Sequence, residues 1–375
     1  MTSHNVRTRP WAFISNMYPS DEDVSYGAFV QRSHEDLCAE GFAIDDVIAI
    51  RGRLGGRRRL KAYALHYARL ARVLLRPDLR HWYMHYASHH CLLPALGARL
   101  LGKQVVVNIH GDDLVLARAS LYRRVMAFGQ TLLLRSSRLL VVPSPFFKEL
   151  LLRRLPDIDP ERIVVSPSSG IDFCALHAAT AGRPCYWECA PAQRTAEIGY
   201  IGRIDADKGW ETLFDAFIAL PAALRAGARL HFWGEGKDSG RLRERIAAEG
   251  EGRIVHHGAI PASELPLAHA RFDFQVVPSL RESLGLAALE GLGAGHVLIC
   301  NAIRPFTDMT VDGVSALHVD HQSGRDLATV LAGALQLPDG ALRVLARNGQ
   351  EVARAFDRPA VAATLAHQID THLAY

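Results

Sequence analysis

Short apolar runs rich in β-branched residues alternate along the whole chain with longer segments in which apolar residues recur at helical spacing. Such alternation is typical of parallel sheets that carry helices on both faces. We therefore predict an α/β fold with two Rossmann-like domains, one in residues 1–170 and one in residues 196–356. The expected strands lie near residues 12–16, 46–50, 80–86, 104–109, 138–142 and 162–166 in the first domain, and near residues 196–201, 228–233, 253–257, 273–277, 297–300 and 315–319 in the second.

The stretch between the two predicted domains breaks this pattern. Residues 171–195 are rich in proline, glycine and small side chains, which predicts a linker. Residues 357–375 return to helical periodicity and are expected to form a last helix. A length of 375 residues exceeds the usual size of a single hydrophobic core, so two domains are also the expectation from length.

The composition is that of an ordinary globular protein, with 49% hydrophobic and 22% charged residues. Residues 1–16 lack the basic stretch and apolar run of a secretory signal, and no window is apolar over the roughly 18 residues of a spanning helix. The six cysteines are scattered, and the nearest pair, Cys185 and Cys189, has no second pair at zinc spacing. We expect a soluble cytoplasmic protein in which these thiols stay reduced.

Positive charge is concentrated in the first half of the chain. Residues 1–165 hold 24 lysines and arginines against 15 acids, whereas the rest holds 19 against 24. The densest segment, residues 51–80, predicts a helix that combines apolar with basic side chains, namely Tyr63, Leu70 and Leu74 with Arg69, Arg72 and Arg76. Two interpretations stay open, a helix lying on an anionic membrane and a surface helix with a solvated arginine face. Nucleic acid is not expected as a partner, because no binding motif accompanies the charge.

Candidate chemistry begins in residues 278–300, which read as an apolar strand, a turn and a helix. Ser283 is a good N-cap residue, so the helix is expected to begin directly after it. The amides at a helix start attract phosphate, and here they would belong to Leu284, Gly285 and Leu286.

Two acids, Glu282 and Glu290, lie eight positions apart in this segment. Eight helical residues span about 12 Å, roughly the distance from a sugar across a diphosphate to a ribose. Glu282 would then accept hydrogen bonds from sugar hydroxyls and Glu290 from ribose hydroxyls. The alternative is an amphipathic helix with two solvated acids.

A second motif lies upstream, where a predicted strand ends at Gly202 and the following loop carries Arg203 and Lys208. Two fixed cations facing two carboxylates and a helix start form a site for a polyanion with hydroxylated ends. A nucleotide diphosphate sugar fits that description. The alternative is a solvated loop with two cations.

These segments resemble the donor-site motifs of a large group of retaining glycosyltransferases that includes glycogen synthase, known as family 4 of the GT-B fold. The family patterns V-G-R-x(4)-K-G and P-S-x(2)-E-x-F-G-x(4)-E are matched by Ile201-Gly202-Arg203, Lys208-Gly209, Pro278-Ser279, Glu282, Gly285 and Glu290. The resemblance covers nearly the whole chain. It implies a GT-B fold, a nucleotide diphosphate sugar as donor, and a C-terminal helix that returns to the first domain.

The resemblance also implies residues on the other side of the site. An H-G-x-D segment, here His110, Gly111 and Asp113, places the histidine beside the donor sugar in that family. Gly27 follows the first strand, where the family often has two adjacent glycines that let the backbone approach a phosphate or sugar. The alternatives are a packed histidine and a turn glycine.

Two further motifs are expected to be structural. Asp205-Ala206-Asp207 resembles a metal-binding D-x-D, but the neighbouring cations already neutralise a diphosphate and the family generally needs no metal. Gly234-Glu235-Gly236 and Gly240 imitate a dinucleotide fingerprint and are expected to form a turn near the donor. We therefore expect neither a metal nor another cofactor.

Four histidines, His81, His85, His89 and His90, are close in sequence but are not expected to share one face. The segment passes from strand to helix near Ala87, so core packing is the preferred interpretation.

The sugar pocket departs from the family pattern after residue 300. Asp308 takes the place of an acid that lies near the donor sugar in the family, but no Gly-Gly turn precedes it. Our hypothesis is that Arg304 contacts a carboxylated or otherwise modified sugar.

The sequence thus predicts a retaining glycosyltransferase that moves a sugar to a hydroxyl of a saccharide or lipid-linked acceptor, in polysaccharide or glycolipid biosynthesis. Three alternatives remain: a nucleotide-sugar epimerase of the same fold, a catalytically inactive homologue that binds nucleotide sugars, and a soluble oxidoreductase.

Overall fold

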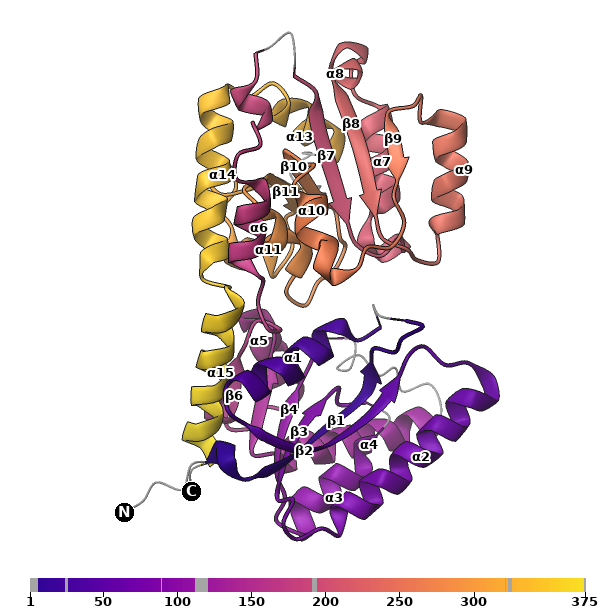
Figure 1. The fold of residues 1–375 in the computed structure, drawn as a ribbon, viewed down its shortest axis with the longest axis vertical. Helices are drawn as coiled ribbons and strands as arrows, with labels where there is room; N and C mark the ends of the chain where they lie inside the picture. Colours follow the sequence, from indigo (N-terminus) through magenta and orange to yellow (C-terminus); the bar gives the residue numbers. More distant parts are fainter. Residues whose placement is uncertain are drawn as a thin grey trace. The chain divides into compact units, whose positions relative to one another are not determined.

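The computed structural model describes residues 6–23, 26–88, 90–111, 121–190, 194–320, 322 and 326–373, with the backbone alone at 121–123. The chain divides into two compact units (Figure 1). Unit 1 comprises Met1–Ser169 together with Pro359–Tyr375, and unit 2 comprises Gly170–Arg358.

Unit 1 contains a six-stranded sheet in the order β2-β1-β3-β4-β5-β6, in which all neighbouring strands are parallel. The strands are β1 (Pro10–Tyr18), β2 (Ala43–Arg51), β3 (His81–His85), β4 (Gln104–Asn108), β5 (Leu139–Val142) and β6 (Ile163–Val165). The central strands are apolar runs that are buried throughout, as expected for a sheet covered on both faces.

Helices cover both faces of this sheet. Helices α2 (Gly56–Leu74), α3 (Leu92–Leu100), α4 (Leu121–Ser136) and α5 (Pro145–Arg154) share one core cluster on one face, and α1 (Ala28–Ala39) and α15 (Arg358–Leu373) share another on the opposite face. Short 3-10 helices lie at Val6–Thr8 and Pro160–Arg162. Local sequence sets the helix starts: the Ser144 hydroxyl accepts the Phe147 N–H, and Pro145 fills the first position of α5.

Unit 2 contains a second parallel six-stranded sheet in the order β12-β11-β10-β7-β8-β9. The strands are β7 (Ala196–Ile201), β8 (Ala228–Trp233), β9 (Ile254–His256), β10 (Phe274–Val277), β11 (Val297–Asn301) and β12 (Leu317–Val319). All twelve predicted strands overlap observed ones, which confirms the predicted fold class of two doubly wound parallel sheets.

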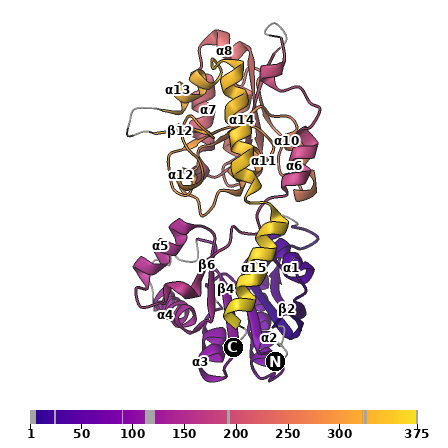
Figure 2. The same cartoon turned by 90° about the vertical axis from the view of Figure 1, so that its left-hand side faces the viewer.

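The helices of unit 2 also lie on both faces of their sheet, and Figure 2 shows α14 beside α11. Gly349 of α14 approaches so closely that an added Cβ would lie 2.6 Å from Leu292 of α11. The helices are α6 (Phe173–Thr180), α7 (Trp210–Ile218), α8 (Ala222–Ala226), α9 (Ser239–Glu249), α10 (Leu265–His269), α11 (Leu286–Gly293), α12 (Phe306–Met309), α13 (Leu327–Ala334) and α14 (Asp339–Arg354), with 3-10 helices η4 (Tyr186–Glu188), η6 (Ala206–Lys208) and η7 (Ala262–Glu264).

The segment predicted as a linker, residues 171–195, differs from that expectation. It begins inside unit 2 and forms α6 and η4. Besides its proline and glycine residues, the segment contains three large apolar side chains that are buried in the cores of unit 2: Phe173, Leu176 and Trp187. Their burial fixes the segment in place, because apolar surface removed from water is the main stabilising contribution in folding.

The last helix, α15, belongs mostly to unit 1. Its buried residues Leu365, Ala366 and Ile369 join the cluster that contains Val30 and Leu37 of α1. Arg7 reinforces this end of the unit through an ion pair of 2.7 Å with Asp370. No described helix is long and apolar enough to cross a bilayer.

Candidate functional site

The strand order of unit 2 places a topological switch point between β7 and β10. The chain leaves β7 toward β8 and β9, and then returns to β10 on the other side of β7. Ligands of open parallel sheets bind at the carboxyl ends of strands, at such a reversal. The loops after β7 and β10 carry the two predicted donor motifs, so the topology brings the two motifs to one edge.

Close backbone contacts join these two loops. The Leu280 N–H donates to the Asp207 carbonyl at 3.0 Å. Gly209 has φ +71°, and a Cβ on it would lie 2.1 Å from the carbonyl oxygen of Pro278. Only glycine fits this conformation at this distance without displacing one of the loops.

Lys208 and Glu282 meet across the same junction. Lys208 Nζ lies 2.6 Å from Glu282 Oε1, and the two side chains are 19% and 15% exposed. The pairing joins a predicted phosphate-binding cation to a predicted sugar-binding carboxylate. Each charge is therefore compensated by the other.

Arg203 is held by the two carboxylates of the predicted D-x-D segment. Its guanidinium forms ion pairs with Asp205 and, at 3.6 Å, with Asp207, while the Tyr200 hydroxyl donates to the Arg203 carbonyl at 2.7 Å. Asp205 is buried and also accepts the Lys237 N–H at 2.8 Å. These aspartates therefore position the arginine and the neighbouring loop, a role that the sequence did not suggest.

The glycine turn after β8 packs on the end of β7. Gly234 has φ +128°, and a Cβ there would lie 1.9 Å from the carbonyl oxygen of Gly202. Gly236 approaches Ile204 in the same way, with a Cβ position 2.3 Å from its carbonyl. Gly202 and the Gly234-Glu235-Gly236 turn thus support the loop that carries Arg203.

The predicted start of α11 is wrong. The helix begins at Leu286, and its N-cap is Gly285 at φ +87° instead of Ser283. A Cβ at Gly285 would lie 2.3 Å from the ring of Phe306, so packing against α12 fixes the left-handed conformation. Of the three amides expected at the helix start, those of Leu284 and Gly285 precede the helix, and only Leu286 lies in its first turn.

Glu290 lies in the middle of α11 and is only 8% exposed. The same region contains two buried polar residues that the sequence analysis missed. Asn301 Nδ2, at the end of β11, donates to the carbonyls of Pro278 (2.9 Å) and Ser279 (3.0 Å), and so holds the loop before α11. Gln275 Nε2 donates to the Ala287 carbonyl at 2.8 Å. The only sequence signal for either was an amide side chain in an apolar strand.

Arg304 and Asp308 face each other. Arg304 Nε donates to both Asp308 carboxylate oxygens, at 2.7 and 2.9 Å. The side chains are 35% and 21% exposed. The contact of Arg304 with a modified sugar stays a prediction, and such a sugar would compete with Asp308.

Unit 1 has its own switch point between β1 and β3, followed by Gly27. Gly27 is the N-cap of α1 at φ +80°, and an added Cβ would lie 2.8 Å from Met17 Cγ. Gly27 thus packs closely on the end of β1, and the approach of its backbone to a phosphate or sugar stays a prediction. Asp113 lies outside the described residues, as do Asp112 and His89.

His110 follows β4 and stacks on His85 at the end of β3. The ring centroids are 4.9 Å apart, and His85 Nδ1 and His110 Nε2 share a hydrogen bond of 2.7 Å. His85 Nε2 in turn lies 3.1 Å from the Ser33 hydroxyl of α1. Phe29 of α1 also contacts His110, with ring centroids 4.9 Å apart. His85 is fully buried, as core packing predicted, but it also orients His110, which the sequence analysis did not suggest.

Burial keeps both rings of this pair neutral. Desolvation lowers the pKa of His110 to about 3 and holds the pKa of His85 well below its ordinary value. One imidazole therefore donates to the other without either carrying charge.

Elsewhere, His90 pairs with His66 at 2.9 Å and His81 packs on Trp11, so the described histidines of this segment occupy separate places. No group of three or more ligating side chains arranged for a metal occurs in the described part of the chain.

Acid is expected to destabilise unit 1 through these histidines. A histidine side chain in the unfolded chain has a pKa of about 6.5. Below that pH the unfolded chain therefore binds protons that the two buried imidazoles do not bind in the folded state. Stability is therefore complete above about pH 6.5 and falls as the pH drops toward the folded value, by up to about 1.4 kcal/mol per pH unit for each imidazole. Urea unfolding followed by circular dichroism at several pH values between 7.5 and 5.5 measures this slope.

The matched variants are His110→Gln and His367→Gln. His367 is exposed on α15, so its variant should keep the wild-type slope. His110→Gln removes one buried imidazole and should flatten the slope. An identical pH dependence in all three proteins would show that the pair does not control acid stability.

Comparisons with known proteins agree with this architecture. Residues 190–352 match the family described as Glycosyl transferases group 1, and residues 28–168 match the Glycosyl transferase 4-like domain. A 2-deoxystreptamine N-acetyl-D-glucosaminyltransferase from Streptomyces fradiae is 28% identical over 252 residues, which cover 64% of this chain and 58% of that protein. A D-inositol 3-phosphate glycosyltransferase from Corynebacterium glutamicum is 29% identical over 216 residues, or 56% of this chain and 51% of that protein. The chain thus spans about half the length of the curated relatives it matches.

Solved structures share the whole fold. Sucrose-phosphate synthase from Thermosynechococcus elongatus superimposes with a TM-score of 0.71 at 20% identity, covering 97% of this chain and 98% of that chain. HepE from Anabaena, solved with UDP and glucose, gives a TM-score of 0.70 at 14% identity, covering 97% and 100%. With the two sequence matches, these similarities confirm the expected family, and the chain belongs to the group 1 glycosyl transferases of the GT-B fold.

Proposed function

We propose that the chain is a retaining glycosyltransferase that moves a sugar from a nucleotide diphosphate sugar to a hydroxyl of a saccharide or lipid-linked acceptor. The observation that carries this proposal is the Lys208–Glu282 pair at the β7/β10 switch point, with Arg203 on the same loop. A cation and a carboxylate in contact can bind a ligand that offers phosphate oxygens beside hydroxyls.

In the proposed reaction, the bond between the anomeric carbon and the diphosphate oxygen breaks. The acceptor oxygen bonds to the same carbon from the same face, and its proton passes to the departing phosphate. Charge grows on the leaving diphosphate in the transition state, so the preplaced cations Lys208 and Arg203 lower the barrier. No metal ion or other cofactor is required in this proposal.

The remaining residues bind the donor in the proposed complex. Glu282 exchanges Lys208 for sugar hydroxyls, Glu290 holds the ribose, and the first amides of α11 face phosphate oxygens. His110 is assigned to the hydroxyls of the donor sugar by the family resemblance. Its neutral ring, fixed by His85, suits a hydrogen bond to a hydroxyl better than an ion pair.

The place of the reaction is proposed to be the cytoplasm, in polysaccharide or glycolipid biosynthesis. All six cysteines are free thiols, and burial raises the pKa of Cys185 to about 11, which suits inert thiols in a reducing compartment.

A melting screen with UDP, GDP, ADP and their sugars tests donor binding. A ligand that binds only the folded state at one hundred times its dissociation constant stabilises by about 2.7 kcal/mol. We expect one nucleotide to raise the midpoint by several degrees, with UDP tested first because HepE was solved with UDP-glucose. Donor binding would be excluded if no nucleotide sugar shifted the midpoint.

Incubation of the stabilising donor with and without acceptors then separates the alternatives. A transferase releases the nucleotide diphosphate as the acceptor is glycosylated, whereas an epimerase isomerises the donor without any acceptor. An inactive homologue binds the donor and does neither.

A further inference from the structure

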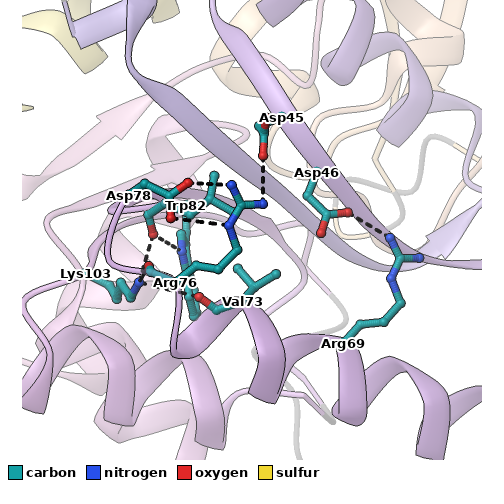
Figure 3. A network of polar contacts seen from close by, with 9 residues as sticks. Asp45, Asp46, Arg69, Val73, Arg76, Asp78, Trp82 and Lys103 are labelled. Atoms are coloured by element: carbon teal, nitrogen blue, oxygen red, sulfur yellow. Dashed lines mark hydrogen bonds and ion pairs between the residues drawn. The ribbon is translucent and has the colours of Figure 1, made fainter.

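Two arginines of the basic segment point inward and are already paired (Figure 3). Arg69 contacts Asp46 of β2 at 2.8 Å, and Arg76 contacts Asp45 at 3.0 Å and also Asp78. These ion pairs hold the C-terminal half of α2, through Arg69, and the segment that follows it, through Arg76, against the neighbouring strand β2. Neither arginine is therefore available to an outside partner without losing its carboxylate.

A third cation of this region is buried. Lys103 is 5% exposed, donates to the Leu79 carbonyl at 3.0 Å, and lies 5.5 Å from the ring centre of Trp82. Desolvation lowers its pKa. Figure 3 shows this lysine beside the Arg76 network, so the inner side of α2 has satisfied its charges.

The outer face of α2 is different. Four exposed cations remain there, and none has an ion pair with any residue that the structure describes: Arg57, Arg58, Lys61 and Arg72. Helix α2 contains no acid. Between these cations lie Leu60 and Leu65, which are 75% and 63% exposed.

This acid-free surface continues onto the neighbouring helices. Neither α3 nor α4 contains an aspartate or glutamate. Both pack on the same side of the sheet as α2 and expose further apolar side chains, with Leu100 at 70% and Phe128 at 65%. Over residues 51–111 the sequence has twelve lysines and arginines against one acid, Asp78.

From this arrangement we infer that the outer face of α2, extended by α3 and α4, docks on an anionic lipid bilayer. Cations without internal partners attract anionic headgroups, and each contributes to binding near the surface. Exposed leucine and phenylalanine side chains between them enter the boundary between headgroups and acyl chains, as in interfacial helices. A nucleic acid would neutralise the cations but would leave the leucines in water. The inference goes beyond the proposed function and does not depend on it.

Vesicle flotation with the full chain tests the docking. The wild type should float with phosphatidylcholine vesicles that contain about one third phosphatidylglycerol, and should stay in solution with pure phosphatidylcholine. Raised salt should weaken the binding, because exposed charges are screened. The inference would be overturned if the wild type did not bind the vesicles that contain anionic lipid. It would also be overturned if the wild type bound a single-stranded polynucleotide but no vesicle.

Two matched pairs of variants locate the surface. Arg58→Glu with Arg72→Glu should weaken vesicle binding by more than roughly tenfold, from the loss and reversal of two surface charges. The control, Arg343→Glu with Arg347→Glu, makes the same change on exposed positions of α14 in unit 2 and should bind within about twofold of wild type. Leu65→Ser should also weaken binding, whereas Leu267→Ser, at 64% exposure in unit 2, should not.

Equal melting temperatures must first show that all variants are folded. Binding unchanged in either α2 variant overturns the inference, and so does an equal loss in an α2 variant and its control. Donor binding in the melting screen is measured in parallel, so failure of the docking surface is distinguishable from failure of the proposed function.

Discussion

Replacing Lys208 with alanine is expected to lower the rate of sugar transfer by roughly 10²- to 10³-fold, the usual effect of removing one preplaced group that stabilises transition-state charge. Lys208 is half-buried against Glu282 at 2.6 Å, so its charge lies at a fixed place when a diphosphate departs. Its removal also leaves the Glu282 carboxylate unpaired beside the site, and this carboxylate would repel phosphate. We expect kcat to fall and the donor-induced rise in melting temperature to shrink.

Steady-state kinetics and circular dichroism of four variants measure this effect. Arg347→Ala, an exposed cation of α14, serves as a control and should keep wild-type turnover. Glu282→Ala alone, and Lys208→Ala combined with Glu282→Ala, complete a double-mutant cycle that gives the coupling energy of the pair. A folded Lys208→Ala variant whose kcat/KM stays within about threefold of wild type would refute the assigned site.

The second large effect is expected for Gly209→Ala, which should destabilise unit 2 by about 3 kcal/mol or more. The new Cβ would lie 2.1 Å from the Pro278 carbonyl oxygen. This distance is too short, so the loops after β7 and β10 must move apart. A loss of this size lowers the melting temperature by roughly 10 °C in a unit of this length. Donor binding should fall as well, because the same contact holds Lys208 opposite Glu282.

Gly313→Ala provides a matched control for this variant. Gly313 has the same φ of +71°, but no atom lies within 4 Å of its added Cβ. This variant should therefore show only the backbone cost of a left-handed alanine, about 1–2 kcal/mol. Scanning calorimetry of both variants separates the two contributions. Equal shifts would mean that the approach of Pro278 does not constrain the loop.

The strands and the donor loops could be predicted because their signals are local. A buried parallel strand is a short apolar run wherever it lies, so the strand at residues 196–201 was predicted at its observed bounds. The meeting of Lys208 with Glu282 followed from motifs that both come directly after strands. Strand order then brought the two loops together.

The start of α11 and the pairing of Arg203 could not be predicted, because both depend on contacts distant in sequence. Ser283 has a good capping side chain, but Phe306 of α12 packs where a Cβ of Gly285 would lie and sets the helix start there. Asp205 resembles a metal ligand in the sequence, but in the structure one of its carboxylate oxygens accepts the Lys237 N–H and the other contacts the Arg203 guanidinium.

The roles of the arginines in the basic segment also depend on residues distant in sequence. Sequence alone could not separate Arg69 and Arg76, which face Asp46 and Asp45, from Arg72, which faces outward. The pattern on α2 gives the periodicity of its arginines but not the acids on the neighbouring strand. The sequence analysis therefore grouped the arginines that pair with acids of β2 together with those that face outward.

The contact between Lys208 and Glu282 also has a consequence for selectivity. A stray inorganic phosphate must compete for the lysine with a carboxylate tethered at contact distance, whose effective concentration far exceeds that of a free ion. An incoming molecule gains most when it satisfies both members of the pair at once, with oxyanions for one and hydroxyl protons for the other. In the proposed site, the pair therefore favours a ligand that carries both kinds of group over a simple anion.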